Sequence, residues 1–177
     1  ALLRQDRIEG YLLFLEAHRY QSPKRGSWTA GEVEGVKGEL ALFCLPAQMT
    51  VPILLRWALV YEDDRAEILH LARAIPYRWL ISGKEISVEN APTRWGRLSM
   101  ALRYEPDLRH ISVNISLPKT APSDVRLYVR LPSGMNFASP QGESLSDCVV
   151  SATYGVNIDG KQGSQYSFQV PIIRHHR

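Results

Sequence analysis

The spacing of apolar residues changes once along this chain, and that change limits the fold more than any other feature. In "LLRQDRIEGYLLFLEAHRY" the apolar residues recur at intervals of three and four, which is typical of an amphipathic helix. A second apolar run predicts a helix over 51–62, with Thr50 as its N-cap and Pro52 in its first turn. From about residue 66 the spacing becomes two. The sequence therefore predicts helices near 2–19 and 51–62, followed by strands.

The strand predictions depend on five alternating runs. They are bounded by turn-forming stretches such as "SGKE", "YEPDLR" and "PKTAPSD". Their apolar positions are Ile86 and Val88; Leu98, Met100 and Leu102; Ile111, Val113, Ile115 and Leu117; Val125, Leu127, Val129 and Leu131; and Tyr166, Phe168, Val170 and Ile172. Short half-buried strands at this spacing indicate a sandwich. We predict an α+β fold with a helical segment over 1–65 and an antiparallel β-sandwich over 66–177, which holds at least six strands and no substantial helix over 84–132.

Composition excludes several classes of protein. The net charge of the 177 residues is only +3 and the cationic residues are scattered, so we predict no nucleic-acid partner. The most apolar stretch is too short to span a bilayer, so we predict no membrane association. Cys44 and Cys148 lie far apart without metal-ligand spacing, which favours free thiols over a disulfide and predicts neither a metal nor a cofactor. No signal peptide is visible, and the chain opens at Ala1 without Met, so the compartment is left open.

The predicted helix over 51–62 is apolar around almost its whole circumference. A helix with that pattern is normally buried on most sides. One preceding helix cannot cover it. We therefore predict that this helix packs against the rest of a larger helical assembly or against another chain.

The stretch from Leu69 to Tyr104 joins the two predicted parts and resembles a known junction. It carries L-x-L-x-x-A-x-P-x-x-W, then a glycine, then a strand with G-x-L-S; the matching residues are Leu69, Leu71, Ala74, Pro76, Trp79 and Gly83. This pattern resembles the exit from the (α/α)6 toroid of six-hairpin glycoside hydrolases into their C-terminal β-sandwich. Upstream, "RGSWTAGE" and "PAQMTVPILLRWALVYED" resemble the last helical hairpin of such a toroid, and "VRLYVRLPSG" is similar to a strand and turn of the sandwich.

This resemblance implies the end of an α/α toroid followed by its sandwich, in the C-terminal region of a carbohydrate-active enzyme. Such an enzyme acts on a poly- or oligosaccharide by hydrolysis or by elimination. A complete toroid needs many more helices than this chain offers. The main catalytic residues are then expected upstream, and this chain alone is expected to be inactive. The alternative is a non-catalytic module, either carbohydrate-binding or purely structural.

The long aperiodic loop between the two predicted helices is the predicted ligand site. Trp28 can stack on a sugar ring, and Arg25 can hold a substrate carboxylate. Glu32 and Glu34 are candidates for acid or base catalysis, and Gln48 can line the same pocket. Alternatively, the tryptophan fills the helical core, the two glutamates are solvated and the glutamine is a solvated amide or a cap. The inward strand positions are uniformly aliphatic, so we place a ligand at the loop and not on the sandwich.

Two tryptophans at the junction are open to two interpretations. Trp79 and Trp95 follow Arg78 and Arg94 in the sequence. The structural interpretation, which we favour, is that each ring seals the sheets against the helical layer, with the arginines stacked or extended beside it. The functional interpretation is a second platform for a sugar.

Overall fold

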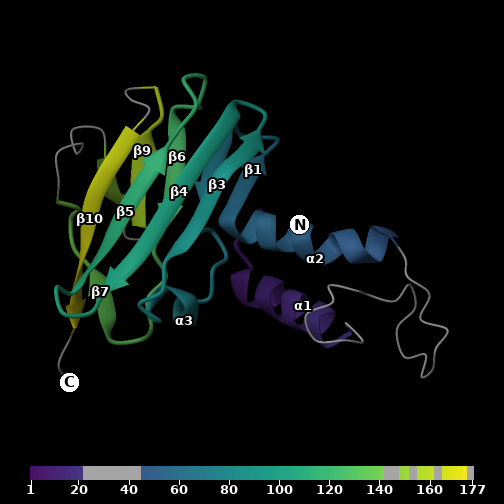
Figure 1. Ribbon diagram of the computed structural model, residues 1–177, viewed down its shortest axis with the longest axis horizontal. Helices are drawn as coiled ribbons and strands as arrows, with labels where there is room; N and C mark the ends of the chain where they lie inside the picture. Colours follow the sequence, from purple (N-terminus) through teal and green to yellow (C-terminus); the bar gives the residue numbers. More distant parts are fainter. Residues whose placement is uncertain (22–44, 142–147, 152–154, 162–164, 175–177) are drawn as a thin grey trace. The chain divides into compact units, whose positions relative to one another are not determined.

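A computed structural model describes most of the chain in two compact units (Figure 1). The described residues are 1–21, 45–141, 148–151, 155–161 and 165–174. The first unit runs from Ala1 to Ala58 and the second from Leu59 to Arg177. Each unit is described by itself below.

The first helix of the helical unit, α1 (Ile8–Gln21), begins later than the sequence predicts. A turn precedes it, in which the Arg7 N–H donates to the Leu2 carbonyl and the Asp6 N–H donates to the Leu3 carbonyl. This pair of bonds is the Schellman arrangement that ends a helical turn. Asp6 takes the left-handed conformation that the arrangement requires, with φ of 55°. The predicted helix over 2–19 is therefore interrupted at Asp6.

The second helix, α2 (Leu45–Leu59), starts before its predicted cap. Thr50 lies inside the helix and Pro52 is an interior residue, so the prediction of an N-cap at Thr50 is wrong. Pro46 occupies the first turn, where its missing N–H removes no helical hydrogen bond. The first-turn proline of α2 is therefore Pro46 and not Pro52.

The helix also ends before its predicted limit at residue 62. Strand β1 (Val60–Asp63) begins directly after Leu59 and pairs antiparallel with β2 (Ile68–Leu71). β-Branched and aromatic residues such as Val60 and Tyr61 favour strands when a partner is present. The partner lies a few residues further along the chain, which an apolar helical pattern cannot reveal.

The second unit consists mainly of two five-stranded sheets, and we call it the two-sheet unit. In the first sheet the order is β1-β2-β6-β9-β8, with β6 (Asp124–Tyr128), β8 (Cys148–Ser151) and β9 (Gly155–Asp159). In the second the order is β3-β4-β5-β10-β7, with β3 (Ile86–Thr93), β4 (Gly96–Glu105), β5 (His110–Ser116), β7 (Met135–Phe137) and β10 (Gln165–Arg174). A short helix, α3 (Tyr77–Leu80), lies between β2 and β3 in the sequence.

The α+β prediction is confirmed at this level. Two helices come first, ten strands follow in the described part of the chain with the short α3 after the second of them, and the described residues between 84 and 132 form no helix. One pairing differs from the predicted antiparallel pattern, because β2 and β6 run parallel. Parallel neighbours need a long crossover connection, and here the chain forms β3, β4 and β5 of the other sheet between them. Sequence alternation reports which face is buried and not which strand is the neighbour.

The inward side chains of both sheets form one hydrophobic cluster. The first sheet contributes Val60, Leu69, Leu71, Val125, Leu127, Val156 and Ile158, and the second contributes Leu98, Met100, Leu102, Ile111, Val113, Ile115, Tyr166, Phe168, Val170 and Ile172. Figure 1 shows β3, β4, β5 and β10 as one layer in front of β6 and β9. Along the long strands β4, β5 and β10, alternate residues are therefore buried in this cluster, and the residues between them form the outer face.

Candidate functional site

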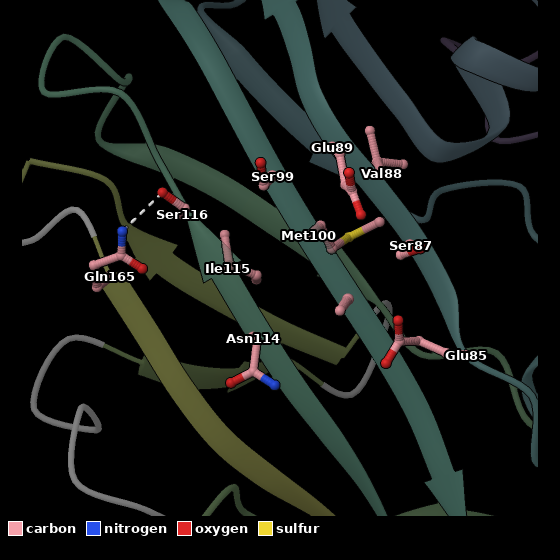
Figure 2. A pocket seen from close by; sticks show the side chains of 11 residues that line it. Glu85, Ser87, Val88, Glu89, Ser99, Met100, Asn114, Ile115, Ser116 and Gln165 are labelled. Atoms are coloured by element: carbon pink, nitrogen blue, oxygen red, sulfur yellow. Dashed lines mark hydrogen bonds between the residues drawn. The ribbon is translucent and has the colours of Figure 1, made fainter.

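A shallow groove crosses the outer face of the second sheet. It has a volume of ≈ 190 Å³, and Figure 2 shows the side chains that line it, which come from β3, β4, β5 and β10 and from Glu85, the residue before β3. The polar members of the lining are Glu85, Ser87, Glu89, Ser99, Asn114, Ser116 and Gln165. Because the groove is open and shallow, it suits part of an extended chain better than an enclosed small molecule.

Strand register brings these polar side chains into rows. Ser116 is the cross-strand partner of both Gln165 and Ser99. Two residues along β5, Asn114 is the partner of Ser167 and of Ala101. Side chains on one face recur every two residues, about 7 Å apart along a strand. The groove therefore presents hydroxyl and amide groups in parallel rows across four strands.

The hollow follows from the sizes of neighbouring side chains. Small residues occupy the centre of the lining: Ser87, Ser99 and Ala101, from β3 and β4. Longer side chains, such as Glu85 and Gln165, come from either side of them. A sheet face on which small residues have larger neighbours leaves room that the sheet itself does not fill.

The hydrogen bonds of the lining leave groups available to a ligand. The Gln165 side-chain N–H donates to Ser116 Oγ at 2.8 Å, and Ser167 Oγ donates to Asn114 Oδ1 at 2.9 Å (Figure 2 shows the first of these). An amide group has two N–H donors besides its acceptor oxygen. The amide nitrogen of Asn114 bonds to none of the described residues and is on the exposed face. Asn114 can therefore donate to a bound hydroxyl.

The charged groups of the lining are both acidic. Glu85 and Glu89 are exposed, and neither forms an ion pair with a residue in the described ranges. Two arginines of β4 have other contacts: Arg97 donates to the Asn90 carbonyl at 2.9 Å, and Arg103 pairs with Glu105 at 3.2 Å. No lysine or arginine is among the residues that line the groove.

A second polar cluster lies on the outer face of the first sheet and is buried. His70 of β2 and Tyr128 of β6 approach each other, with 2.8 Å between His70 Nδ1 and the Tyr128 hydroxyl. One guanidinium nitrogen of Arg73 lies 2.8 Å from the same Nδ1 and also donates to the Tyr128 hydroxyl. Tyr61 stacks on the His70 ring with a centroid distance of 5.5 Å. This cluster joins the parallel strand pair through side chains.

The contacts of His70 define its protonation. Arginine can only donate, so the Nδ1 that it contacts must carry a lone pair, and the ring is neutral. Burial, with the positive charges of Arg73 and Arg126, lowers the pKa of His70 from 6.5 to about 3. Asp63 and Asp124 oppose this shift without overcoming it. The ring is therefore held as a neutral acceptor, which suits packing between strands better than proton transfer near neutral pH.

The residues that the sequence analysis assigned to ligand binding are not among those described. Arg25, Trp28, Glu32 and Glu34 lie outside the described ranges, and so does the side chain of Gln48, whose backbone is part of α2. The loop site therefore stays a prediction.

The two junction tryptophans differ. Trp95 is partly buried against the hydrophobic cluster, and the Arg94 guanidinium lies 4.1 Å from the centre of its ring, as the stacked-arginine interpretation predicts. Trp79 is 41% exposed, whereas its neighbour Leu80 is buried. The buried side chain of α3 is thus Leu80, and the ring of Trp79 is accessible.

Sequence reasoning missed the groove on the second sheet. It treated the strands as packing elements because only their inward positions were weighed. A signal was present at the positions between them: the outward residues of β5 and β10 are mostly Ser, Asn and Gln, with few of the charged side chains common on solvated sheets. Small uncharged polar residues on adjacent strands were the available indication.

Comparison with protein-family models, with curated proteins and with solved structures finds no significant match. Within the described ranges, no group of three or more His, Cys, Asp or Glu side chains is arranged to hold a metal ion. None of the described helices has both the length and the apolar character needed to cross a membrane.

Proposed function

We propose that this chain binds a poly- or oligosaccharide through the groove on its second sheet, as the C-terminal region of a glycoside hydrolase-like enzyme. One observation carries the binding proposal: hydroxyl, amide and carboxylate side chains from four strands line one open groove. Sugars offer hydroxyl groups that both donate and accept, and such side chains match them. The enzymatic part is supported by the resemblance of the junction sequence to the six-hairpin hydrolases. The main catalytic residues would lie upstream, and the chain alone would be inactive.

The rival proposal within the same family is a non-catalytic module, either carbohydrate-binding or structural. The described residues favour binding over a purely structural role, because a face that serves only as a solvated surface has no need of a small-residue hollow. The loop with Arg25, Trp28, Glu32 and Glu34, next to Gln48, remains a second proposed ligand site.

Calorimetric titration of the full chain with a panel of plant and bacterial glycans tests the proposal. Ala101→Trp should fill the groove and abolish binding, and Asn114→Ala should weaken it by about 1 kcal/mol, the scale of one hydrogen bond. Gln169→Ala is the matched control, since Gln169 is exposed on the same face of β10 but outside the groove. Binding that survives Ala101→Trp but is lost in Trp28→Ala would move the site to the loop. Loss only in a folded Trp79→Ala variant would move it to the junction.

We also propose that α2 packs against the rest of a toroid or against another chain. Met49, Ile53 and Trp57 are spaced by four residues, so they share one face of α2, and all three are exposed. On α1, Leu13 and Phe14 are exposed as well. Large exposed apolar residues that gather on one face usually mark an interface. Light scattering measures the mass of the chain alone and in the presence of the upstream protein. The proposal would be contradicted if the chain is a monomer alone and Trp57→Gln does not change the mass measured with the upstream protein.

A further inference from the structure

We infer that the groove on the second sheet selects a sugar polymer that carries free, protonated amino groups. This inference rests on the proposed carbohydrate binding and names its substrate class. Among glycans, the candidates are uncharged chains, uronate-containing chains with carboxylates, and amino-sugar chains with free amines. The composition of the lining distinguishes these three.

The neutral part of the lining recognises hydroxyl groups. Ser87, Ser99 and Ser116 each provide one hydroxyl, and Asn114 and Gln165 provide amides. These groups bind any sugar and discriminate little between the classes. They account for recognition of a polyhydroxyl chain as such.

The charged side chains of the lining discriminate between the three classes of glycan. Glu85 and Glu89 both come from the β3 side of the groove, they are exposed, and no ion pair with a described residue neutralises them. An anionic chain would approach two carboxylates with no cationic side chain of the lining to receive it. A neutral chain could donate its hydroxyl groups to these carboxylates, but it would lack the attraction between opposite charges. A chain with protonated amines can form a charge-assisted hydrogen bond with each carboxylate, which is stronger than a neutral one.

The geometry supports contact at more than one point along a chain. Glu89 lies on β3 and Glu85 directly precedes that strand, so the two are four residues apart, which corresponds to roughly 13 Å if the backbone is extended throughout. β3 pairs with β4 through a register shift between Val88 and Ala91, where Asn90 takes a φ of 50°. The two carboxylates are thus spread along the groove, and the amines of separate sugar units could meet them.

The two carboxylates could have another role, because β3 is at the edge of its sheet. Charged residues and bulges on an edge strand discourage pairing with another chain, and β3 is an edge strand with both. A purely protective role predicts no difference between ligands that differ only in charge. The experiment therefore compares such ligands.

The full chain is titrated with a chitosan oligosaccharide and with the chitin oligosaccharide of equal length, which has the same backbone with its amines acetylated. We expect tighter binding of the chitosan ligand, reduced by added salt. Glu85→Gln and Glu89→Gln should each weaken chitosan binding by about two- to fivefold, on the scale of exposed ion pairs, and should leave chitin binding unchanged. Asp107→Asn is the control, because Asp107 is exposed in the turn after β4 and does not line the groove.

The outcomes separate the two proposals. Equal affinity for both ligands, with Ala101→Trp still abolishing it, would overturn the amino-sugar inference and leave carbohydrate binding intact. Tighter binding of a uronate oligosaccharide than of chitosan would overturn it as well. Absence of binding to every glycan tested would refute both proposals. The substituted residues lie on the outer face or, for Asp107, in an exposed turn, so melting curves of the variants should match that of the unsubstituted chain.

Discussion

The two units of this molecule bury their apolar residues to different extents. The two-sheet unit encloses one continuous hydrophobic cluster, to which both sheets contribute side chains. The helical unit buries a small set, including Ile8, Tyr11 and Leu54, while Met49, Ile53 and Trp57 remain exposed. Two helices cannot bury broad apolar faces between themselves, whereas two facing sheets can bury one face each. From this difference we expect the sheets to be stable by themselves, and it is consistent with the proposal that a partner covers the helices.

Separating the units is the most severe test of this comparison. We expect a fragment of residues 59–177 to unfold in a single cooperative transition, because it retains the whole cluster. A fragment of residues 1–58 should show no cooperative transition, because its few buried residues cannot offset the entropy of ordering the chain. Circular dichroism melting curves measure both. A cooperatively folding 1–58 fragment would refute the comparison.

Matched leucine substitutions give the next largest effect. Leu127 is 0% exposed in the cluster, and Leu13 is 71% exposed on α1. Leu127→Ala should lower the free energy of unfolding by about 2–5 kcal/mol, through lost burial and the cavity that remains. Leu13→Ala should change it by less than about 0.5 kcal/mol. Urea denaturation of both variants tests this, and similar losses would show that α1 is covered in solution.

The His70 cluster refines the comparison, because it is a polar element inside the well-packed unit. The folded-state pKa of His70 is about 3, below the 6.5 of the unfolded chain. Between these values only the unfolded chain binds the proton, so the neutral ring contributes its full stability above pH 6.5 and loses it as pH falls toward 3. The loss should amount to at most about 5 kcal/mol.

The measurement is the free energy of unfolding against pH, for the unsubstituted chain and for His70→Gln. Glutamine retains an acceptor oxygen but no titrating group. The variant should therefore show a shallower decline between pH 6.5 and 3. Identical slopes would mean that His70 is protonated in the fold, contrary to its contact with Arg73.

Neighbouring residues of α3 provide the smallest expected effect. Trp79 is 41% exposed and Leu80 is 2% exposed. Removing a buried tryptophan side chain typically costs about 3–5 kcal/mol, and for Trp79 we expect about 1 kcal/mol because much of the ring is already in water. Leu80→Ala should cost more than Trp79→Ala in thermal denaturation. The reverse order would show that the tryptophan is the buried anchor.

The alternation of apolar and polar residues correctly predicted strands whose one buried face produces that alternation. Leu98, Met100 and Leu102 alternate with polar residues because one face of β4 is buried, and this signal can be read without a structure. The end of α2 could not be predicted in this way. Val60 and Tyr61 continue the apolar run of the helix, and only the pairing of β1 with β2 makes them a strand.

The candidate site was predicted less well than the fold, because a groove on a sheet depends on register. Asn114 lies beside Ser167 although 53 positions separate them in the chain. No sequence motif connects such residues. The parallel pairing of β2 with β6 was unpredicted for the same reason.

That parallel pairing has a consequence for the order of folding. The β3, β4 and β5 strands pair with their neighbours in sequence, so their contacts close short loops. The β2 and β6 strands can join only after the chain has passed through all three, which is a contact of long range with a higher entropic cost. We expect the three-stranded meander to form early and the first sheet to close over it late. Until it closes, the inward side of the meander, with Leu102 and Val113, faces water, and this interval is when newly made chains are most prone to aggregate.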